Sequence, residues 1–361
     1  MLLMIKVIRW IFRYLVLITN VVFATFLVCA YISTEVSAAK SQILPFFGLF
    51  YVPILIVNVF FILYWLLFSK KKKFAFVSLF AFLVGISTFL SVFRFSRPLE
   101  SPQLDLGVLT YNTRMFRDEH HKPVNIESLM DEFAKKKANV YCFQEAIFTK
   151  ENTVKDALLS FAKITGDKYY YFSDNQRYII TSFLIVGKGA KNFENTPNGY
   201  MWVDLKINDD TVRVINSHLQ SNSLLLEQYN NTLSEYGLDS DEMKKQALDL
   251  GHRLSTGFRK RAEQVDALLA GIEDCPYPVL VCGDFNEPPV SYTHGSITKK
   301  TSDSFEKRGR GIGSTYRGKL PFLRIDYVFY SDKMFNPTIY QNLEIGDSDH
   351  YPVYVGFELL K

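Results

Sequence analysis

Residues 279–286 of this chain read Val-Leu-Val-Cys-Gly-Asp-Phe-Asn, a short apolar run that ends in a glycine and two polar side chains. The apolar part predicts a buried strand over Pro278–Cys282, and Gly283 allows the backbone to turn where the strand stops. Asp284 and Asn286 lie on the same side of the chain if it is locally extended. The carboxylate can then position or deprotonate a water molecule, while the carboxamide donates to a phosphate oxygen. Taken alone, the pair is equally typical of an Asx-turn.

Five more clusters place a polar side chain at the end of an apolar, β-rich run. They are Tyr111-Asn112, Gln144-Glu145, Ser217-His218-Leu219, Arg324-Ile325-Asp326-Tyr327 and Ser348-Asp349-His350. Their carboxylates, carboxamides and imidazoles suit a hard cation together with a phosphate. One cluster would mean little, but the set of six predicts a metal-dependent phosphoesterase.

The chemistry of each side chain gives it an expected role. Glu145 is the best candidate for the principal Mg²⁺ ligand, Asn112 can orient the water shell of the cation, and Asp349 offers a further ligand. His350 can stabilise phosphate charge. Asp326 is flanked by apolar side chains and is costly to bury unless a histidine pairs with it. The polar ends of these clusters offer no soft ligand, which argues against Zn²⁺ bound through thiolates.

Composition divides the chain into two parts. Apolar residues make up 48% of the 361, and the excess lies before Phe93. Three uncharged apolar runs, at about 14–32, 43–68 and 74–93, each approach or exceed the roughly 20 residues that span a bilayer. They predict three transmembrane helices in a membrane anchor over 1–97. A linker is expected at 98–103 and a catalytic domain over 104–361.

Basic residues give the expected orientation of this multi-pass anchor. Those that flank the runs on one side are Lys6, Arg9, Arg13 and Lys70–Lys73. Because positive charge stays cytoplasmic, the catalytic domain is expected outside the cell (inner) membrane, in an extracytoplasmic or periplasmic location. If the first run is a signal peptide cleaved near Ser37-Ala38-Ala39, the two remaining crossings leave the domain on the same side.

Hydrophobic periodicity predicts many strands and two helical stretches after the linker. The expected strands are 104–110, 139–143, 169–172, 178–186, 200–207, 211–217, 278–282, 323–330 and 353–359, and the expected helices are 126–137 and 224–272, the second broken near 236–241. This order favours two packed β-sheets flanked by helices, an α/β class.

The ordered motifs resemble those of the endonuclease/exonuclease/phosphatase superfamily, which has a deoxyribonuclease-I-like fold. The likeness covers about residues 104–359 and rests on Leu109-Thr110-Tyr111-Asn112, Phe143-Gln144-Glu145, Asn216-Ser217-His218-Leu219, Gly283-Asp284-Phe285-Asn286, Arg324-Ile325-Asp326-Tyr327 and Ser348-Asp349-His350. The resemblance implies a four-layer α/β sandwich of two mixed sheets. It also implies that Glu145 binds the divalent cation, Mg²⁺ with Mn²⁺ as the alternative, assisted by Asn112 and Asp349.

The resemblance further implies in-line attack of water on a phosphate ester. Asp284 would orient or activate the water, and Asn286 would hold the phosphate. Asp326 would pair with His350, and His218 would contact the phosphate or help the leaving group. The Ser-His-Leu cluster is similar to that of the deoxyribonuclease, sphingomyelinase and phosphatase branches. Two departures are the strand 178–186, which lacks the usual Gly-rich, Ser-containing form, and the long helical insert 224–254.

The substrate stays open at this point. A phospholipid such as sphingomyelin, a nucleic acid and a small phosphate ester all fit the motifs, and an extracytoplasmic endonuclease or exonuclease is the main alternative. The net charge of +4 suits an anionic substrate without demanding nucleic acid. A non-catalytic binding module on the same fold is a minor alternative. A transport function is disfavoured because no charged residue lies inside the apolar runs.

Overall fold

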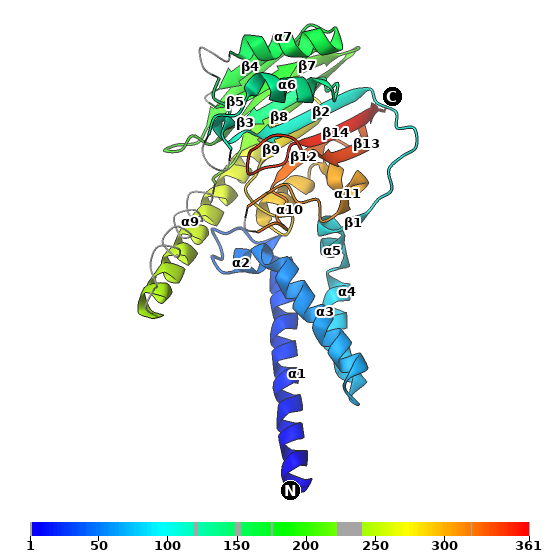
Figure 1. Ribbon diagram of the computed structural model, residues 1–361, viewed down its shortest axis with the longest axis vertical. Coiled ribbons are helices and arrows are strands. Elements are labelled where there is room, and N and C mark those ends of the chain that lie inside the picture. Colours follow the sequence, from blue (N-terminus) through cyan, green and yellow to red (C-terminus); the bar gives the residue numbers. More distant parts are fainter. Residues whose placement is uncertain are drawn as a thin grey trace.

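The computed structural model describes residues 2–118, 122–148, 153–174, 176–221, 240–318 and 320–360. Figure 1 shows a group of helices at the N-terminal end below a larger part built of strands and helices. We call residues 2–95 the N-terminal unit. Its helices are α1 (Leu2–Ser33), α2 (Leu44–Leu49), α3 (Tyr51–Leu67), η1 (Lys72–Phe74), α4 (Ala75–Val84) and α5 (Ile86–Val92).

The expectation of three transmembrane helices needs correction. Within the described residues only Leu3–Ser33 is by itself long and apolar enough to cross a membrane, and its place near the N-terminus is equally typical of a signal sequence. The run 43–68 is divided at Phe50 into α2 and the 17-residue α3. The run 74–93 bends by 64° at Gly85, so it counts as a second span only if both of its pieces are taken together. Glycine is a poor residue for a helix interior, which explains the break.

Buried polar side chains hold the three helical stretches together. The Ser78 hydroxyl of α4 lies 2.5 Å from Asn20 Oδ1 of α1 and 2.7 Å from Asn58 Oδ1 of α3. The Asn58 amide also donates to the carbonyls of Phe23 and Ile54. Such interhelical hydrogen bonds are characteristic of helices that pack where water is scarce.

Two six-stranded mixed sheets form the larger part of the molecule. The first has the order β13-β14-β2-β3-β5-β4 and the second has the order β10-β12-β9-β8-β7-β6. Their bounds are β2 (Leu106–Asn112), β3 (Val140–Gln144), β4 (Tyr170–Asp174), β5 (Arg177–Thr181), β6 (Leu184–Asn192), β7 (Gly199–Ile207), β8 (Asp210–His218), β9 (Val279–Asp284), β10 (Ser302–Asp303), β12 (Asp326–Tyr330), β13 (Phe335–Asn342) and β14 (Val353–Leu359). A two-stranded ribbon of β1 (Arg94–Phe95) and β11 (Arg310–Gly311) lies beside them.

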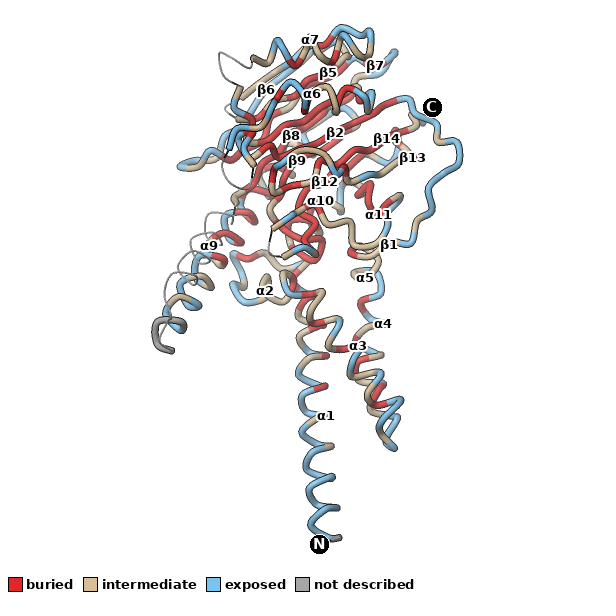
Figure 2. Tube along the Cα trace, in the orientation of Figure 1, coloured by how far each residue is buried: buried red, intermediate tan, exposed pale blue. Residues whose placement is uncertain are grey.

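The sheets pack face to face and carry helices on their outer faces. Val108, Cys142, Val214 and Val355 belong to the core between the sheets, which Figure 2 shows as a band of buried strands. The outer face of the first sheet is covered by α6 (Ile126–Ala134) and α7 (Val154–Thr165). The outer face of the second sheet is covered by α9 (Ser240–Glu273) and α10 (Tyr292–Thr298), with α11 (Ser304–Arg308) nearby. The architecture is therefore an α/β sandwich.

Several predicted elements differ from the structure. The predicted strand 178–186 is two strands, because the chain leaves the first sheet after Thr181 and enters the second at Leu184. Sequence periodicity missed β13 and α7, and β12 begins only at Asp326. The predicted helix 224–272 corresponds to α9 from Ser240, whereas residues 224–239 and the predicted break near 236–241 lie largely outside the described residues.

A buried ion pair lies where the second sheet meets the N-terminal unit. Arg324 Nη1 donates to Asp303 Oδ2 at 2.6 Å, and His294 Nε2 lies 3.0 Å from the same oxygen. Burial opposes ionisation of Asp303, but the positive charge of Arg324 and the hydrogen bond from His294 outweigh it and lower the pKa of Asp303 to about 2. Both side chains of the pair are fully buried. Each charge is therefore neutralised by its partner, and loss of one partner would leave the other as an unpaired buried charge.

We expect this pair to make stability depend on acid pH. Because the pKa of Asp303 is lower in the folded state, its contribution of about 2 kcal/mol is present above the unfolded pKa near 4 and disappears as pH falls through about 2. Asp303→Asn removes the charge at every pH. The stability difference between wild type and variant, measured by denaturant unfolding, should shrink between pH 5 and pH 2.5. A constant difference would contradict the assignment.

Candidate active site

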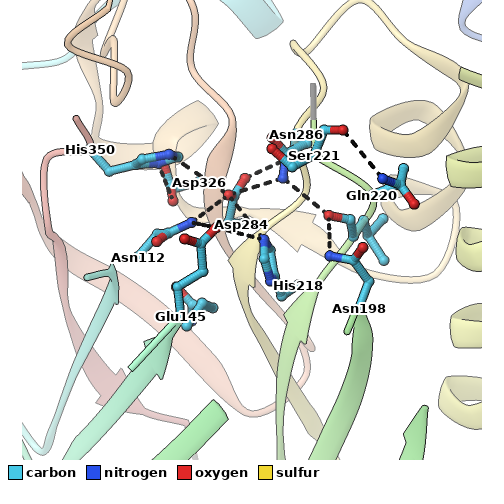
Figure 3. Close-up of polar contacts among 12 residues, drawn as sticks. Asn112, Glu145, Asn198, His218, Gln220, Ser221, Asp284, Asn286, Asp326 and His350 are labelled. Carbon is cyan, nitrogen blue, oxygen red and sulfur yellow. Dashed lines mark hydrogen bonds and ion pairs between the residues drawn. The ribbon is translucent and has the colours of Figure 1, made fainter. Parts of the chain in front are cut away.

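Two parallel strand pairs bring the predicted polar residues to one edge of the sandwich. In the first sheet β2 and β3 run parallel, with Asn112 opposite Gln144. In the second sheet β8 and β9 run parallel, with His218 opposite Asp284, and antiparallel β12 places Asp326 opposite Asp284 from the other side. Carboxyl ends of neighbouring parallel strands lie at the same edge. The side chains meet there, as Figure 3 shows.

Asp284 lies at the centre of the group. Its Oδ2 accepts hydrogen bonds from Asn112 Nδ2 at 2.9 Å and Asn286 Nδ2 at 3.0 Å, and its Oδ1 accepts from the Asn286 backbone amide at 2.8 Å. Gly283 has φ of +137°, and a Cβ there would lie 1.9 Å from the Ser217 carbonyl oxygen. Only glycine fits this close approach of two strands. The amides therefore hold the carboxylate in one orientation.

His350 and Asp326 form a hydrogen-bonded pair beside Asp284. His350 Nδ1 lies 2.9 Å from Asp326 Oδ2 and 3.2 Å from Asp326 Oδ1. A carboxylate at Nδ1 fixes a proton on that nitrogen and orients the ring. His350 Nε2 then faces Asp284 Oδ2 at 3.8 Å. The pairing expected from the sequence is thus present in the geometry.

Glu145 forms the more open side of the site. Its Oε1 accepts from Asn112 Nδ2 at 3.1 Å and lies 3.4 Å from His218 Nε2. The Glu145 side chain is 23% exposed, compared with 1% for Asp284. Its backbone has φ of +49° and is held by Met115, whose amide donates to the Glu145 carbonyl at 2.8 Å. Glu145 is therefore the site carboxylate that a ligand from solvent reaches more easily.

Asp349 lies at the rim of the same group. Its Oδ1 is 4.0 Å from Arg114 Nε and 4.0 Å from His350 Nε2. The neighbouring Ser348 hydroxyl donates to the Asn112 carbonyl at 2.8 Å, which ties this loop to the end of β2. All eight predicted site residues thus lie in one contiguous group linked by the contacts above.

The charges in the site are unevenly balanced. Burial raises the pKa of Asp284 to about 6, with a further increase from Asp326. Burial also raises the pKa of Glu145, and the negative charge of Asp349 adds to this. The clustering of carboxylates in a poorly hydrated place is unfavourable unless cations or protons offset it.

The two histidines have opposite protonation tendencies. Burial lowers the pKa of His218 to about 4, and the positive charges of Arg177 and His350 contribute to the same effect. Burial acts in the same direction on His350, but the charge of Asp326, with that of Asp284, raises the pKa of His350 well above its ordinary value. One imidazole is therefore neutral and the other is positively charged at neutral pH.

The donor set fits a hard divalent cation. Asp284, Asp326 and His350 each offer one ligand atom within 4.8 Å of the others. However, both Asp326 oxygens and His350 Nδ1 are already engaged in their mutual hydrogen bonds. The carboxylates of Glu145 and Asp349, whose side chains are 23% and 18% exposed, are the more accessible donors, and the buried Asn112 lies beside Glu145.

Two side chains that support the site had no role assigned from the sequence, although Asn216 belongs to one of the quoted motifs. Asn216 donates to the carbonyls of Phe143 and Tyr178, and so joins the two sheets near the end of β3. Asn198 donates to the Leu219 carbonyl at 3.0 Å, an oxygen that Asn286 also contacts. Their only sequence signal is a polar side chain beside a strand end, which turns share.

We expect Glu145→Gln to weaken Mg²⁺ binding by about tenfold or more, because the amide keeps the shape but removes the charge that a hard cation requires. Isothermal titration of the full chain with MgCl₂ measures the effect. Glu132→Gln on the exposed face of α6 is the matched control and should bind Mg²⁺ as the wild type does. Equal affinity in both variants would remove Glu145 from the metal ligands.

Comparison with known sequences gives two matches to family profiles. The Endonuclease/Exonuclease/phosphatase family matches residues 109–350, and a domain of unknown function (DUF8431) matches residues 13–92. No curated protein matches the chain.

Several solved structures are similar to this chain. An endonuclease/exonuclease/phosphatase family protein from Leptotrichia buccalis C-1013-b has 15% identity and a TM-score of 0.49 over 70% of this chain and 99% of that one. Humanized D. rerio TDP2 has 16% identity and a TM-score of 0.48 over 70% and 98%. A family protein from Bacteroides thetaiotaomicron has 18% identity and a TM-score of 0.47 over 72% and 99%.

Proposed function

We propose, since the chain belongs to the endonuclease/exonuclease/phosphatase family, that it is a membrane-anchored, Mg²⁺-dependent phosphoesterase that cleaves a phospholipid headgroup ester. Family membership supports a phosphoester hydrolase. The observation that carries the assignment is the meeting of Asp284, Asn286, His218 and the Asp326–His350 pair at one sheet edge, next to the accessible carboxylate of Glu145.

The residues have complementary roles in this reaction. Asp284, fixed by two amides, takes a proton from the water whose oxygen attacks phosphorus. The Asn286 amide and the charged His350 ring offset negative charge on the phosphate as the ester P–O bond breaks, and the departing oxygen leaves as an alcohol with a proton from His350. His218 Nε2 is buried and has no hydrogen-bond partner among the described residues, so a phosphate oxygen can satisfy it. Mg²⁺ held by Glu145, Asn112 and Asp349, or Mn²⁺ in its place, would supply further positive charge.

Lipid is favoured over polynucleotide because the N-terminal unit holds the site beside a bilayer. The α1 helix supplies one apolar span, and α3 and α4 pack against it as a hairpin that leads back to the catalytic part (Figure 1). Whether or not this hairpin crosses fully, its two ends lie at the same end of α1. The orientation of α1 therefore settles the side on which the catalytic part lies.

We expect the full chain to hydrolyse sphingomyelin in vesicles with MgCl₂ and to lose this activity in EDTA. Asp284→Asn and His350→Gln should each reduce kcat by about a hundredfold or more. The first removes the group that accepts the proton from water, and the second removes a positive charge beside the phosphate. Asp326→Asn should reduce kcat roughly ten- to a hundredfold, because the His350 ring is then no longer held in its orientation. Release of the phosphorylated headgroup is the measurement.

Asp332→Asn, an exposed carboxylate outside the site, is the control and should retain wild-type turnover. DNA, RNA and a phosphate monoester are assayed in parallel. Cleavage of a polynucleotide with no lipid turnover would establish the nuclease alternative. Mg²⁺-dependent binding of substrate with no turnover of any ester would leave only a binding module.

We also propose that the catalytic part lies outside the cell membrane, because Lys6, Arg9 and Arg13 keep the start of α1 in the cytoplasm. Alkaline phosphatase, which is active only outside, should be active when fused after Lys361 or Lys40. A fusion after Lys73 should be inactive if the hairpin crosses fully. Replacement of the three basic residues by Glu should lower the activity of the terminal fusion. An inactive terminal fusion in the wild type would contradict the orientation.

A further inference from the structure

The N-terminal unit packs directly against the segment that leaves the active site. Gly48 of α2 lies so close to Val290 that a Cβ there would be 2.1 Å from the Val290 carbonyl oxygen. Gly295 of α10 lies against Thr34, and a Cβ there would be 2.5 Å from the Thr34 carbonyl oxygen. Both contacts involve backbone atoms, so a rotation of a side chain cannot relieve them. The N-terminal unit therefore fixes the position of segment 290–295.

This segment is connected to the site by a short, stiff stretch. Asn286 is followed by Glu287-Pro288-Pro289, in which both proline rings restrict the backbone. Glu287 accepts from Arg261 Nε of α9 at 2.9 Å, and the Arg261 side chain is fully buried. Few backbone torsions between Val290 and Asn286 rotate freely. A displacement of Val290 is therefore passed on to Asn286.

A second contact reaches the strand that carries Asp326. Arg324 Nη2 donates to the Ser91 carbonyl at the end of α5 at 2.8 Å, while its Nη1 holds Asp303. The Tyr327 hydroxyl lies 2.7 Å from the Arg324 carbonyl oxygen and 2.8 Å from the Glu287 carbonyl oxygen. One buried hydroxyl thus joins the two segments on which Asn286 and Asp326 are held.

Further contacts broaden the same interface. Glu35 pairs with Lys299 at 2.8 Å, and the Phe46 ring meets Phe258 of α9 edge-on, with centroids 5.3 Å apart. The exposed ion pair contributes little by itself. The aromatic and backbone contacts show that the catalytic part is seated on the N-terminal unit in one orientation.

We propose that the outer rim of the N-terminal unit, residues 33–49 with Ser91, is a positioning element of the active site. It holds the backbone on which Asn286 and Asp326 stand, so the anchor contributes to catalysis and does more than tether. The catalytic consequence rests on the proposed phosphoesterase function. Gly48, Gly295 and Arg324 are positioning residues, and none of them contacts the substrate.

Gly48→Ala and Gly295→Ala test this from the two sides of the interface, in the full chain in lipid nanodiscs. Each methyl group forces the backbones apart. With bis(4-nitrophenyl) phosphate and MgCl₂ as the probe, kcat should fall by about tenfold or more while KM changes by less than about twofold, because small displacements of reacting groups are costly. Deuterium exchange of amides 284–291 should accelerate by about tenfold, whereas that of β2 and β14 should not change.

Gly251→Ala in α9 is the matched control, because a Cβ there meets no atom of the described residues within 4 Å. Gly48 and Gly295 both lie in helices, and alanine is a better helix former than glycine. A lower kcat in these two variants therefore cannot come from weaker helix formation. The proposal would be overturned if amides 284–291 exchanged deuterium at the wild-type rate in both test variants. It would also be overturned if this exchange became faster while kcat stayed unchanged. If the wild type does not hydrolyse the probe, the proposed function fails for phosphodiesters, and the exchange measurement still decides whether the rim positions the site.

Discussion

The parallel pairing of β2 with β3 and of β8 with β9 is the constraint on which the site depends. Each pair ends at the same edge of its sheet, and the two sheets face each other with these edges together. Residues far apart in the chain, such as Asn112 and Asp284, can therefore share a hydrogen bond of 2.9 Å. Any antiparallel arrangement of these pairs would send one member of each to the opposite end of the sandwich.

The backbone around this edge is held in unusual conformations. Arg114, Met115 and Phe116 follow one another with positive φ, and Glu145 and Asn286 share this feature. Non-glycine residues pay for such conformations, and they persist only where the surroundings determine them fully. Here the buried strands on both sides supply the fixed frame, and the turns present the side chains beyond their ends. The concentration of strained residues at one edge agrees with a functional site there.

Much of this arrangement was predictable from the sequence, and the exceptions have physical reasons. Strand ends carry a local signal, an apolar run that stops at a polar side chain, and this signal predicts most of the eight residues that the structure brings together at one edge. The division of 178–186 carries no clear signal, because only Thr181-Ser182 interrupt the apolar residues where the chain passes from one sheet to the other. The bend at Gly85 was hidden for the same reason, since apolar residues continue on both sides. Contacts between the N-terminal unit and the segments that hold the site depend on the tertiary arrangement and leave no pattern in the sequence.

The two histidines show how neighbouring groups decide function when burial is equal. The side chains of His218 and His350 are 7% and 6% exposed, so desolvation disfavours the charged ring at both positions to a similar degree. Asp326 hydrogen-bonds the ring of His350 at 2.9 Å, whereas the ring of His218 has Glu145 Oε1 at 3.4 Å from Nε2. Arg177 and the charged His350 also disfavour a proton on His218. The carboxylate behind one ring therefore raises the pKa of that ring, and positive charge on it lowers the pKa of the other ring. A phosphate ester bound between them would meet a ring that favours its protonated form on one side and a ring that favours its neutral form on the other, which is a division of roles that two equivalent histidines could not provide.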